Sequence, residues 1–472
     1  MDARWRLLAL TSIGAFMAPL DGSIVAVALP RIATALGLGY GPSLWVQAAY
    51  LLTMAVLLIP LGRWADRRGR LRSYLLGIAL FTAGSLLAAL ARSGGMLIGG
   101  RVVQAVGAAL LSATSAALVT AVFPPSERGR ALGINVMAVY AGLSVGPPLG
   151  GFLVDRFGWP SLFLVNLPIG AGVLGWGLHL ARSVKDAEAP VRGGDLPGSL
   201  LLGVGLLGLL IPPTFAAEWG WGDPRLVGLL VLGSLALAGF LFWERRAVSP
   251  LLDLDLLRNR VFTAGNLAAF LNYGALYAVG LLTAAHLQLV QGRSARVAGW
   301  ILLGQPVVQA ALSPLAGHLG DRLGARLLSS LGMGFTALGM GCLALLPAHP
   351  NLPLLIASLA VVGVGMAAFS APNTSAVMGS VARERLGVAA AVLATMRVTG
   401  MAFSVALLGG LAAQGLGSGG WKALVRGGDP SLALVFANGY RAAMTAGALL
   451  ALLGAWASLA RPRRDPGVTS SS

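Results

Sequence analysis

The sequence has little cysteine, histidine or acidic side chain. Its 472 residues include one Cys (Cys342), four His and 17 Asp plus Glu. A single cysteine excludes an intramolecular disulfide and leaves no cysteine-based metal pattern. The chain also lacks a Ser/His/Asp, Cys/His, phosphate-loop or metal-ligand constellation. We therefore expect no enzyme activity, no metal and no bound cofactor.

Charge of both signs is scarce, and apolar residues take its place. Hydrophobic residues make up 56% of the chain and charged residues 11%, which leaves too little polar surface for a soluble fold. A membrane-spanning helix needs about 20 mostly apolar residues. Fourteen such runs follow one another along the chain, and the tenth covers 297–316. The sequence predicts an all-α membrane protein with fourteen spans.

The net charge of +17 raises the question of a polyanionic partner. Lys and Arg, however, gather in the connections on the side that also holds both termini, which is the positive-inside pattern of membrane proteins. We expect a multi-pass protein of the inner (cytoplasmic) membrane with both termini in the cytoplasm. The basic side chains would then contact anionic membrane lipid. Nucleic acid is not an expected partner.

An eight-residue pattern occurs twice, as GRWADRRG at Gly62–Gly69 and as GHLGDRLG at Gly317–Gly324. Asp66 and Asp321 are 255 positions apart, and a second match, Glu127 with Glu384, has an offset of 257. Two six-span halves joined directly would give an offset of roughly 190–200 residues. The repeat therefore indicates two related bundles with two additional spans between them.

We predict three parts along the chain. They are an N-terminal six-helix bundle at 1–182, a linker with two inserted transmembrane helices at 183–261, and a C-terminal six-helix bundle at 262–472. Two related halves that rock around a substrate path between them are typical of secondary transporters.

Asp21 is the only acidic residue well inside an apolar run. An ionisable group in that position is a functional hypothesis by default. Arg101, with Gln104 one turn further on the same helix face, is a basic residue deep in another span. A contact between Asp21 and Arg101 would neutralise both charges and let protonation of Asp21 release Arg101. Proton handling is one interpretation of Asp21, and a hydrogen bond that only packs two helices is the other.

Polar side chains inside the other spans are few, and they suit a cavity for bulky, partly apolar ligands. Arg397 is the second basic residue deep in a span, and a structural contact is as consistent with it as a binding role. The candidate cavity residues are Gln47, Tyr50, Gln104, Tyr140, Asn272, Tyr273, Gln305, Gln309, Asn373 and Arg397.

Two features predict moving parts. Gly142, Gly146 and Gly150 lie at four-residue spacing on one face of the fifth span, with Pro147 and Pro148 between them. Glycines at this spacing let another helix approach closely, and prolines remove backbone donors. We expect this face to govern how the halves pivot. Asp66 and Asp321 end apolar runs beside arginines and suit latches at the cytoplasmic side.

These segments resemble the major facilitator superfamily, and within it the fourteen-span drug/proton antiporters. The resemblance rests on the segment around Asp21, on 62–72, on 101–107 and on the fifth-span motif at 142–151. It implies a major facilitator fold, proton coupling by Asp21 and Arg101, a cytoplasmic gate at Asp66 and Arg70, and a hinge near Gly146 and Pro147.

Three departures from the family pattern narrow the expectation. Trp64 replaces a small aliphatic residue and Leu71 replaces a basic one, so the gate is expected to be weaker. Acidic residues deep in later spans, which help some relatives to bind dications, are absent here. This absence favours monovalent lipophilic cations or neutral amphiphiles over doubly charged drugs.

We therefore predict a monomeric antiporter that exports hydrophobic compounds in exchange for protons, driven by the proton gradient, by alternating access. Export of a lipid or of an endogenous metabolite is the alternative within transport. A non-transporting membrane sensor is the alternative outside it.

Overall fold

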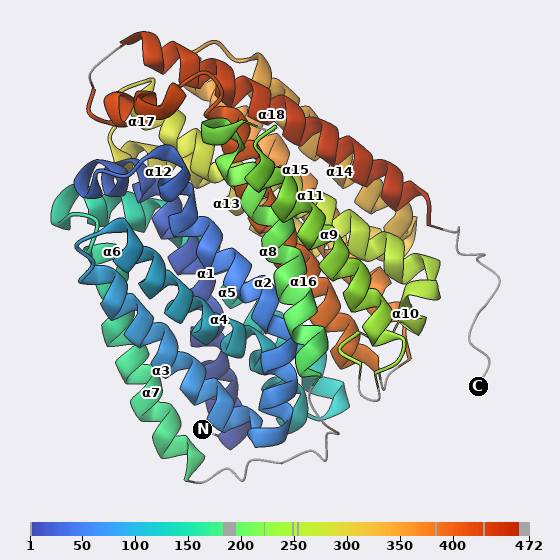
Figure 1. Cartoon of the computed structure of the whole chain (residues 1–472). Coiled ribbons are helices and arrows are strands. Elements are labelled where there is room, and N and C mark those ends of the chain that lie inside the picture. The colour runs from blue at the N-terminus through green and yellow to red at the C-terminus, as the bar shows by residue number, and fades with distance from the viewer. Residues whose placement is uncertain are drawn as a thin grey trace.

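The computed structural model describes residues 2–182, 195–220, 222–247, 250–252, 254–382, 385–427 and 430–461. Every regular element in these ranges is a helix. Residues 183–194, at the start of the predicted linker, lie outside these ranges. Glu384, one member of the second repeat match, also lies outside them. The described chain therefore forms a helical bundle without strands (Figure 1).

The first helices of the chain form one bundle. They are α1 (Ala3–Leu36), α2 (Tyr40–Arg68), α3 (Arg70–Ala89), α4 (Gly94–Val122), α5 (Pro125–Phe157), the short α6 (Ser161–Leu164) and α7 (Asn166–Ala181). Within this N-terminal half, α1 packs on α5, and α4 packs on both α2 and α3.

The last helices form a second bundle. They are α10 (Asp255–Arg258), α11 (Arg260–Leu289), α12 (Ala295–Leu302), α13 (Gly304–Leu323), α14 (Ala325–Leu345), α15 (Leu352–Gly379), α16 (Leu386–Ala412), α17 (Gly417–Val425) and α18 (Pro430–Leu459). Here α11 packs on α16, and α15 packs on both α13 and α14. Since α2 and α13 carry the two copies of the repeat, this packing matches that of the N-terminal half.

Among the described residues, thirteen helices are long and apolar enough to cross a membrane. The predicted tenth span, 297–316, is instead two helices, because α12 ends at Leu302 and α13 begins at Gly304. Pro306 lies in the first turn of α13. Because proline has no backbone N–H, it cannot donate a hydrogen bond to a carbonyl of α12. The prediction of a continuous helix is therefore wrong at Leu303, although α12 and α13 together take the place of the predicted span.

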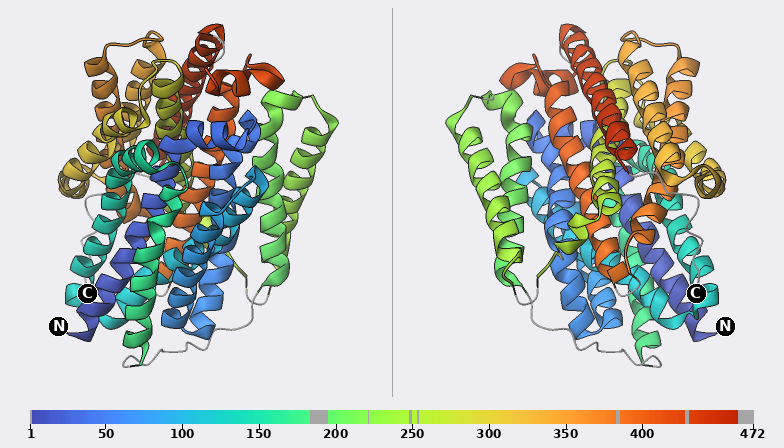
Figure 2. Two further views of the ribbon diagram at one scale, coloured as in Figure 1. Left: turned by 90° about the vertical axis from the view of Figure 1, so that its left-hand side faces the viewer. Right: turned by 90° about the vertical axis from the view of Figure 1, so that its right-hand side faces the viewer.

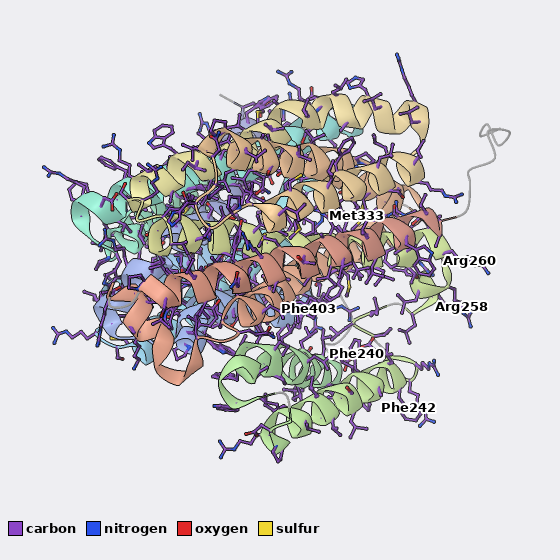
Figure 3. All side chains as sticks on the ribbon, turned by 90° about the horizontal axis from the view of Figure 1, so that it is seen from above. Phe240, Phe242, Arg258, Arg260, Met333 and Phe403 are labelled. Atoms are coloured by element: carbon purple, nitrogen blue, oxygen red, sulfur yellow. The ribbon has the colours of Figure 1, made fainter. Side chains whose placement is uncertain are left out.

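The two helices between the bundles stand at one side of the molecule (Figure 2). They are α8 (Leu196–Trp219) and α9 (Pro224–Glu244). Helix α8 packs on α2 and α16, whereas α9 packs mainly on α8. Figure 3 shows Phe240 and Phe242 on this pair; Phe240 is buried, and Phe242 is exposed. An apolar face exposed in this way suits contact with lipid tails.

The halves meet closely at one end of the bundle. We call the end that holds the start of α1 the inner end, since the sequence predicts that it faces the cytoplasm, and the opposite end the outer end. At the outer end the Tyr40 hydroxyl donates to the Gly409 carbonyl at 2.7 Å, and the Arg296 amide donates to Asp155 at 2.9 Å. The two bundles are thus joined where α2 and α12 begin.

Candidate functional site around Asp21

A buried ion pair lies in the N-terminal half, between the middle of α1 and the first third of α4. An Nη1 N–H of Arg101 donates to Oδ2 of Asp21, and both side chains are 0% exposed. Neither charge has access to water, so each depends on the other for neutralisation. The structure thus brings together the two residues that the sequence singles out for proton coupling.

The second carboxylate oxygen of Asp21 also has partners. The Gln104 amide donates to Oδ1 at 2.7 Å, and the Asn166 amide donates to the same oxygen at 2.9 Å. Both amides also donate to the hydroxyl of Ser85, at 2.8 and 3.4 Å. Helices α1, α3, α4 and α7 therefore meet around one carboxylate.

Arg101 is held in place by more than Asp21. Its Nε donates to the Val46 carbonyl at 3.1 Å, and its Nη1 donates to Oε1 of Gln104 at 2.6 Å. The guanidinium also lies 4.2 Å from the ring centre of Tyr50 and 5.8 Å from that of Phe163. These rings offer the cation a weak attraction in an apolar setting. Arg101 is therefore fixed beside Asp21 from several directions.

Some polar atoms of this network have no hydrogen-bond partner. They are Nη2 of Arg101, Oδ1 of Asn166, the hydroxyl of Tyr50 and Oε1 of Gln47. Buried polar atoms without partners carry a free-energy cost. The Arg101 nitrogen can donate a hydrogen bond and the two amide oxygens can accept one, so a water molecule or a polar group of a ligand would find partners here.

Gln47 connects the neighbourhood of Asp21 to the other half. Its amide donates to the carbonyl of Gly22, the residue after Asp21, at 3.1 Å. The same amide donates to the hydroxyl of Tyr277 on α11. A polar path thus runs from the backbone beside Asp21 into the C-terminal half.

A second polar cluster crosses between the halves at Tyr140. Its hydroxyl lies 3.2 Å from that of Ser370 on α15. One turn further on α15, Thr374 accepts a hydrogen bond from Nη2 of Arg397 on α16, and Arg397 also lies 5.7 Å from the ring centre of Tyr273. The Nε of Arg397 is buried without a hydrogen-bond partner. Three of the predicted cavity residues, Tyr140, Tyr273 and Arg397, are therefore near one another.

The remaining predicted cavity residues are more dispersed. Gln104, Gln47 and Tyr50 belong to the surroundings of Asp21, as described above. Asn272 donates to the sulfur of Met366 at 3.0 Å, and Asn373 donates to the Gly265 carbonyl at 3.2 Å. Gln309 is buried on α13 and is a side-chain hydrogen-bond partner of Tyr140, so it belongs to the Tyr140 cluster, whereas Gln305 is half-buried on the same helix.

The glycine face of α5 packs on α1 within the N-terminal half. A Cβ at Gly142 would lie 2.5 Å from the Phe16 carbonyl oxygen, and one at Gly146 would lie 1.8 Å from the Ser23 hydroxyl. One at Gly150 would lie 2.9 Å from the Ile24 carbonyl oxygen. Contact with the other half begins at the next residue, because a Cβ at Gly151 would lie 2.4 Å from the Ala295 carbonyl oxygen of α12.

The proline pair of α5 also contacts the C-terminal half. A Cβ at Gly299 of α12 would lie 2.1 Å from the Pro147 carbonyl oxygen. Helix α5 continues through Pro147 and Pro148 without a break. The close approach of α5 to α12 at the outer end therefore requires glycine on α12.

The predicted cytoplasmic gate residues lie at the end of α2, at the start of α3 and at the end of α13. Nε of Arg70 donates to Oδ1 of Asp66 at 2.7 Å, and both side chains are about one-third exposed. Asp321 lies in the last turn of α13, and its side chain is outside the described part of the structure. The contact of Asp66 with Arg70 is thus a local pair within the connection from α2 to α3.

The sequence of this chain matches a known protein family over most of its length. The model of the Major Facilitator Superfamily matches residues 11–251 and 265–472. The chain belongs to this superfamily. The predicted all-helical membrane fold of this superfamily is therefore confirmed, and the protein is a major facilitator transporter.

Individual relatives agree with this assignment. The chain is 34% identical over 420 residues to the riboflavin transporter RibZ of Clostridioides difficile, covering 88% of this chain and 90% of that protein. It is 37% identical over 416 residues to the multidrug resistance protein Stp of Mycobacterium tuberculosis, covering 88% and 77%. A solved bacterial homologue of the lysosomal transporter Spinster, in an inward-facing unoccupied conformation, superimposes with a TM-score of 0.67 at 18% identity, covering 97% of each chain.

Three residues of this major facilitator transporter contact the site around Asp21, although the sequence does not predict them as site residues. They are Ser85 and Asn166, which contact the Asp21 network, and Tyr277, which contacts Gln47. Asn166 is a polar residue inside a predicted span, which is the one sequence signal it gives. Ser85 and Tyr277 give none, because hydroxyl groups in spans commonly bond to their own helix.

Proposed function

We propose that this protein is a proton-coupled antiporter that exports hydrophobic or amphiphilic compounds by alternating access. The observation that carries the proposal is the fully buried pair of Asp21 and Arg101. Burial of an ion pair in a membrane interior has a large desolvation cost, so helix packing alone is a poor reason for it. A carboxylate that exchanges a proton during each cycle gives a reason for the pair.

The coupling follows from the contacts of Asp21. Protonation removes the negative charge, so Arg101 loses its counterion and the network around Oδ1 must rearrange. Since Gln47 links Gly22 to Tyr277, a shift of α1 at Asp21 is transmitted to α11. In the described state the halves are joined at the outer end, which in this proposal is the closed side of the pathway.

The driving force is sufficient for useful accumulation. One proton that moves down a membrane potential supplies ~2.3 kcal/mol per 100 mV, before any pH gradient is added. In this proposal the proton gradient replaces any cofactor, a single chain is the functional unit, and both termini face the cytoplasm from the inner membrane.

Two findings support drug-like substrates. The cluster around Tyr140 and Arg397 places aromatic rings beside hydrogen-bonding groups, a combination that suits partly apolar ligands. Stp, a relative at 37% identity, is described as a multidrug resistance protein. Monovalent lipophilic cations and neutral amphiphiles are the substrate classes to test first.

Export of a lipid or an endogenous metabolite is the second candidate. A hollow of about 290 Å³ lies between α5 and α12–α13, lined by Ser144, Val145, Pro148, Leu149, Trp300 and Leu303. Its lining is almost entirely apolar, which favours entry of apolar ligands sideways from the membrane. RibZ, a relative at 34% identity, is described as a transporter of riboflavin, so relatives of this chain include a metabolite transporter.

The test is flux in liposomes that contain the purified protein under an imposed pH gradient. A panel of lipophilic cations, neutral amphiphiles, riboflavin and short-chain lipids is added, and proton movement is followed with an internal pH dye. Proton movement with the drug-like compounds, lost in Asp21→Asn, supports the proposal. Movement with riboflavin or lipid alone supports the second candidate, and proton-independent flux contradicts the coupling.

A further inference from the structure

A cavity of about 780 Å³ lies at the inner end of the C-terminal half. Its walls come from the start of α11, the end of α13, the start of α14, the end of α15 and the residue Arg461 after α18. Arg260, which Figure 3 labels, marks this end of α11. All lining residues belong to the C-terminal half, so the cavity is distinct from the surroundings of Asp21.

Arg461 is the unusual residue of this cavity. The residue is 3% exposed, and one of its nitrogens, Nη2, donates to Oδ1 of Asn373. Its Nε and Nη1 are buried without a hydrogen-bond partner. Burial lowers the pKa of Arg461 to about 10, so the group remains a cation at neutral pH. A buried cation with two unused donors is costly unless a partner supplies acceptors.

A helix N-terminus faces the same cavity. Gly324, Ala325 and Arg326 line it, and α14 begins at Ala325 without a side-chain hydrogen bond at its N-cap. The first amides of a helix of 21 residues carry unused donors and a partial positive charge. The helix therefore adds to the attraction that Arg461 exerts on an anion.

A difference between the two copies of the sequence repeat contributes to the space of this cavity. In the N-terminal half, Arg70 follows Asp66 by four residues and pairs with it. In the C-terminal half, Ala325 stands four residues after Asp321, and it lines the cavity. Small residues on the facing helices, such as Gly320 and Ala376, leave the remaining space.

The charged side chains that the structure describes around this space are cationic. Arg322 and Arg326 line the cavity together with Arg461. Among the lining residues whose side chains the structure describes, none is acidic. Guanidinium groups bind phosphate and carboxylate oxygens through paired hydrogen bonds.

We propose that this cavity is an anion site that binds a phosphate-type oxyanion between Arg461 and the N-terminus of α14. The proposal goes beyond the transport function and does not depend on it. The oxyanion has two possible sources, the headgroup of an anionic membrane lipid or a dissolved phosphate. Both present the same oxygens to Arg461, and the experiment below separates them.

The first measurement is thermal unfolding of the purified full chain in a neutral detergent, after native mass spectrometry has verified that bound lipid is removed. Inorganic phosphate is titrated against chloride at equal ionic strength. The wild-type protein should show a saturable rise of the unfolding temperature. Arg461→Gln should lose this rise, whereas Arg245→Gln, which removes an exposed arginine at the end of α9, should keep it.

The unliganded variants provide a second readout. Without phosphate, Arg461→Gln should unfold at a higher temperature than the wild type, because it removes an unpaired buried cation. Arg326→Gln is at a half-buried position of the wall and should weaken phosphate binding by roughly tenfold. It keeps the proposal testable if Arg461→Gln does not fold.

The source is determined in nanodiscs of neutral phosphatidylcholine with or without phosphatidylglycerol. If the lipid headgroup is the source, phosphatidylglycerol should stabilise the wild type and abolish its response to phosphate. If dissolved phosphate is the source, the response should persist in both membranes. A wild type that does not respond to phosphate in detergent, or an equal response in Arg461→Gln, would overturn the proposal.

Discussion

Gln47 of α2 donates to the hydroxyl of Tyr277 on α11 and also to the carbonyl of Gly22, which follows Asp21 in the chain. One side-chain amide thus joins the buried carboxylate site of the N-terminal half to the C-terminal half. The relation explains how a change at Asp21 reaches the contact between the halves.

Removal of the Tyr277 hydroxyl should weaken the joined state. Tyr277→Phe keeps the ring and leaves the Gln47 amide with the Gly22 carbonyl alone, so the outer end should open more often. Spin labels at Thr34→Cys and Val425→Cys, whose native residues are hydrogen-bonded across the halves, report the distance. A longer mean distance in Tyr277→Phe is expected. Unchanged distances would show that this bond does not contribute to closure.

The buried pair predicts a non-additive stability effect. Asp21→Asn alone leaves Arg101 charged and without its counterion, and should lower the free energy of unfolding by about 3–5 kcal/mol. The double variant Asp21→Leu with Arg101→Met should recover most of this loss, because no buried charge remains. Denaturant unfolding of the single and double variants measures it. Additive losses would contradict the pairing.

The close approach of α5 and α12 predicts a glycine requirement at the outer end. Gly299→Ala places a Cβ against the Pro147 carbonyl oxygen and should prevent closure and reduce transport strongly. Gly133→Ala is the matched control, since a Cβ there would contact nothing within 4 Å. Both variants are measured for flux and for accessibility of outer-end cysteines. Equal flux in the two would show that α5 and α12 can separate without loss.

Arg397 predicts a change in substrate affinity without loss of coupling. Arg397→Gln removes the guanidinium that contacts Thr374 and Tyr273, and it should raise KM by about tenfold for compounds with oxygen acceptors. Protons moved per substrate should stay the same, because Asp21 is untouched. If the ratio of protons to substrate falls instead, Arg397 belongs to the coupling machinery.

The two members of the buried pair could be predicted from sequence, whereas their contact and its surroundings could not. An ionisable residue in an apolar run must face protein or water, so Asp21 and Arg101 stand out. Amides and hydroxyls have lower burial costs and occur throughout spans, so Asn166 and Ser85 do not. Pairing between helices far apart in sequence depends on packing that no local pattern describes.

The glycine face illustrates the same limit. The spacing of Gly142, Gly146 and Gly150 predicts a close approach but not the identity of the partner helix, which is α1 of the same half. The break at Leu303 was missed for a different reason. Hydropathy is continuous across 297–316, and the proline that ends the hydrogen-bond ladder is one residue among twenty.

Proton release on substrate binding tests the central claim most directly. Purified protein is placed in weakly buffered detergent solution at a series of pH values, and at each pH a transported compound is added while a pH dye is followed. The account predicts a saturable release of protons from the wild type and none from Asp21→Asn at matched substrate occupancy. Saturable binding without proton release in the wild type, or equal release in both proteins, would contradict it.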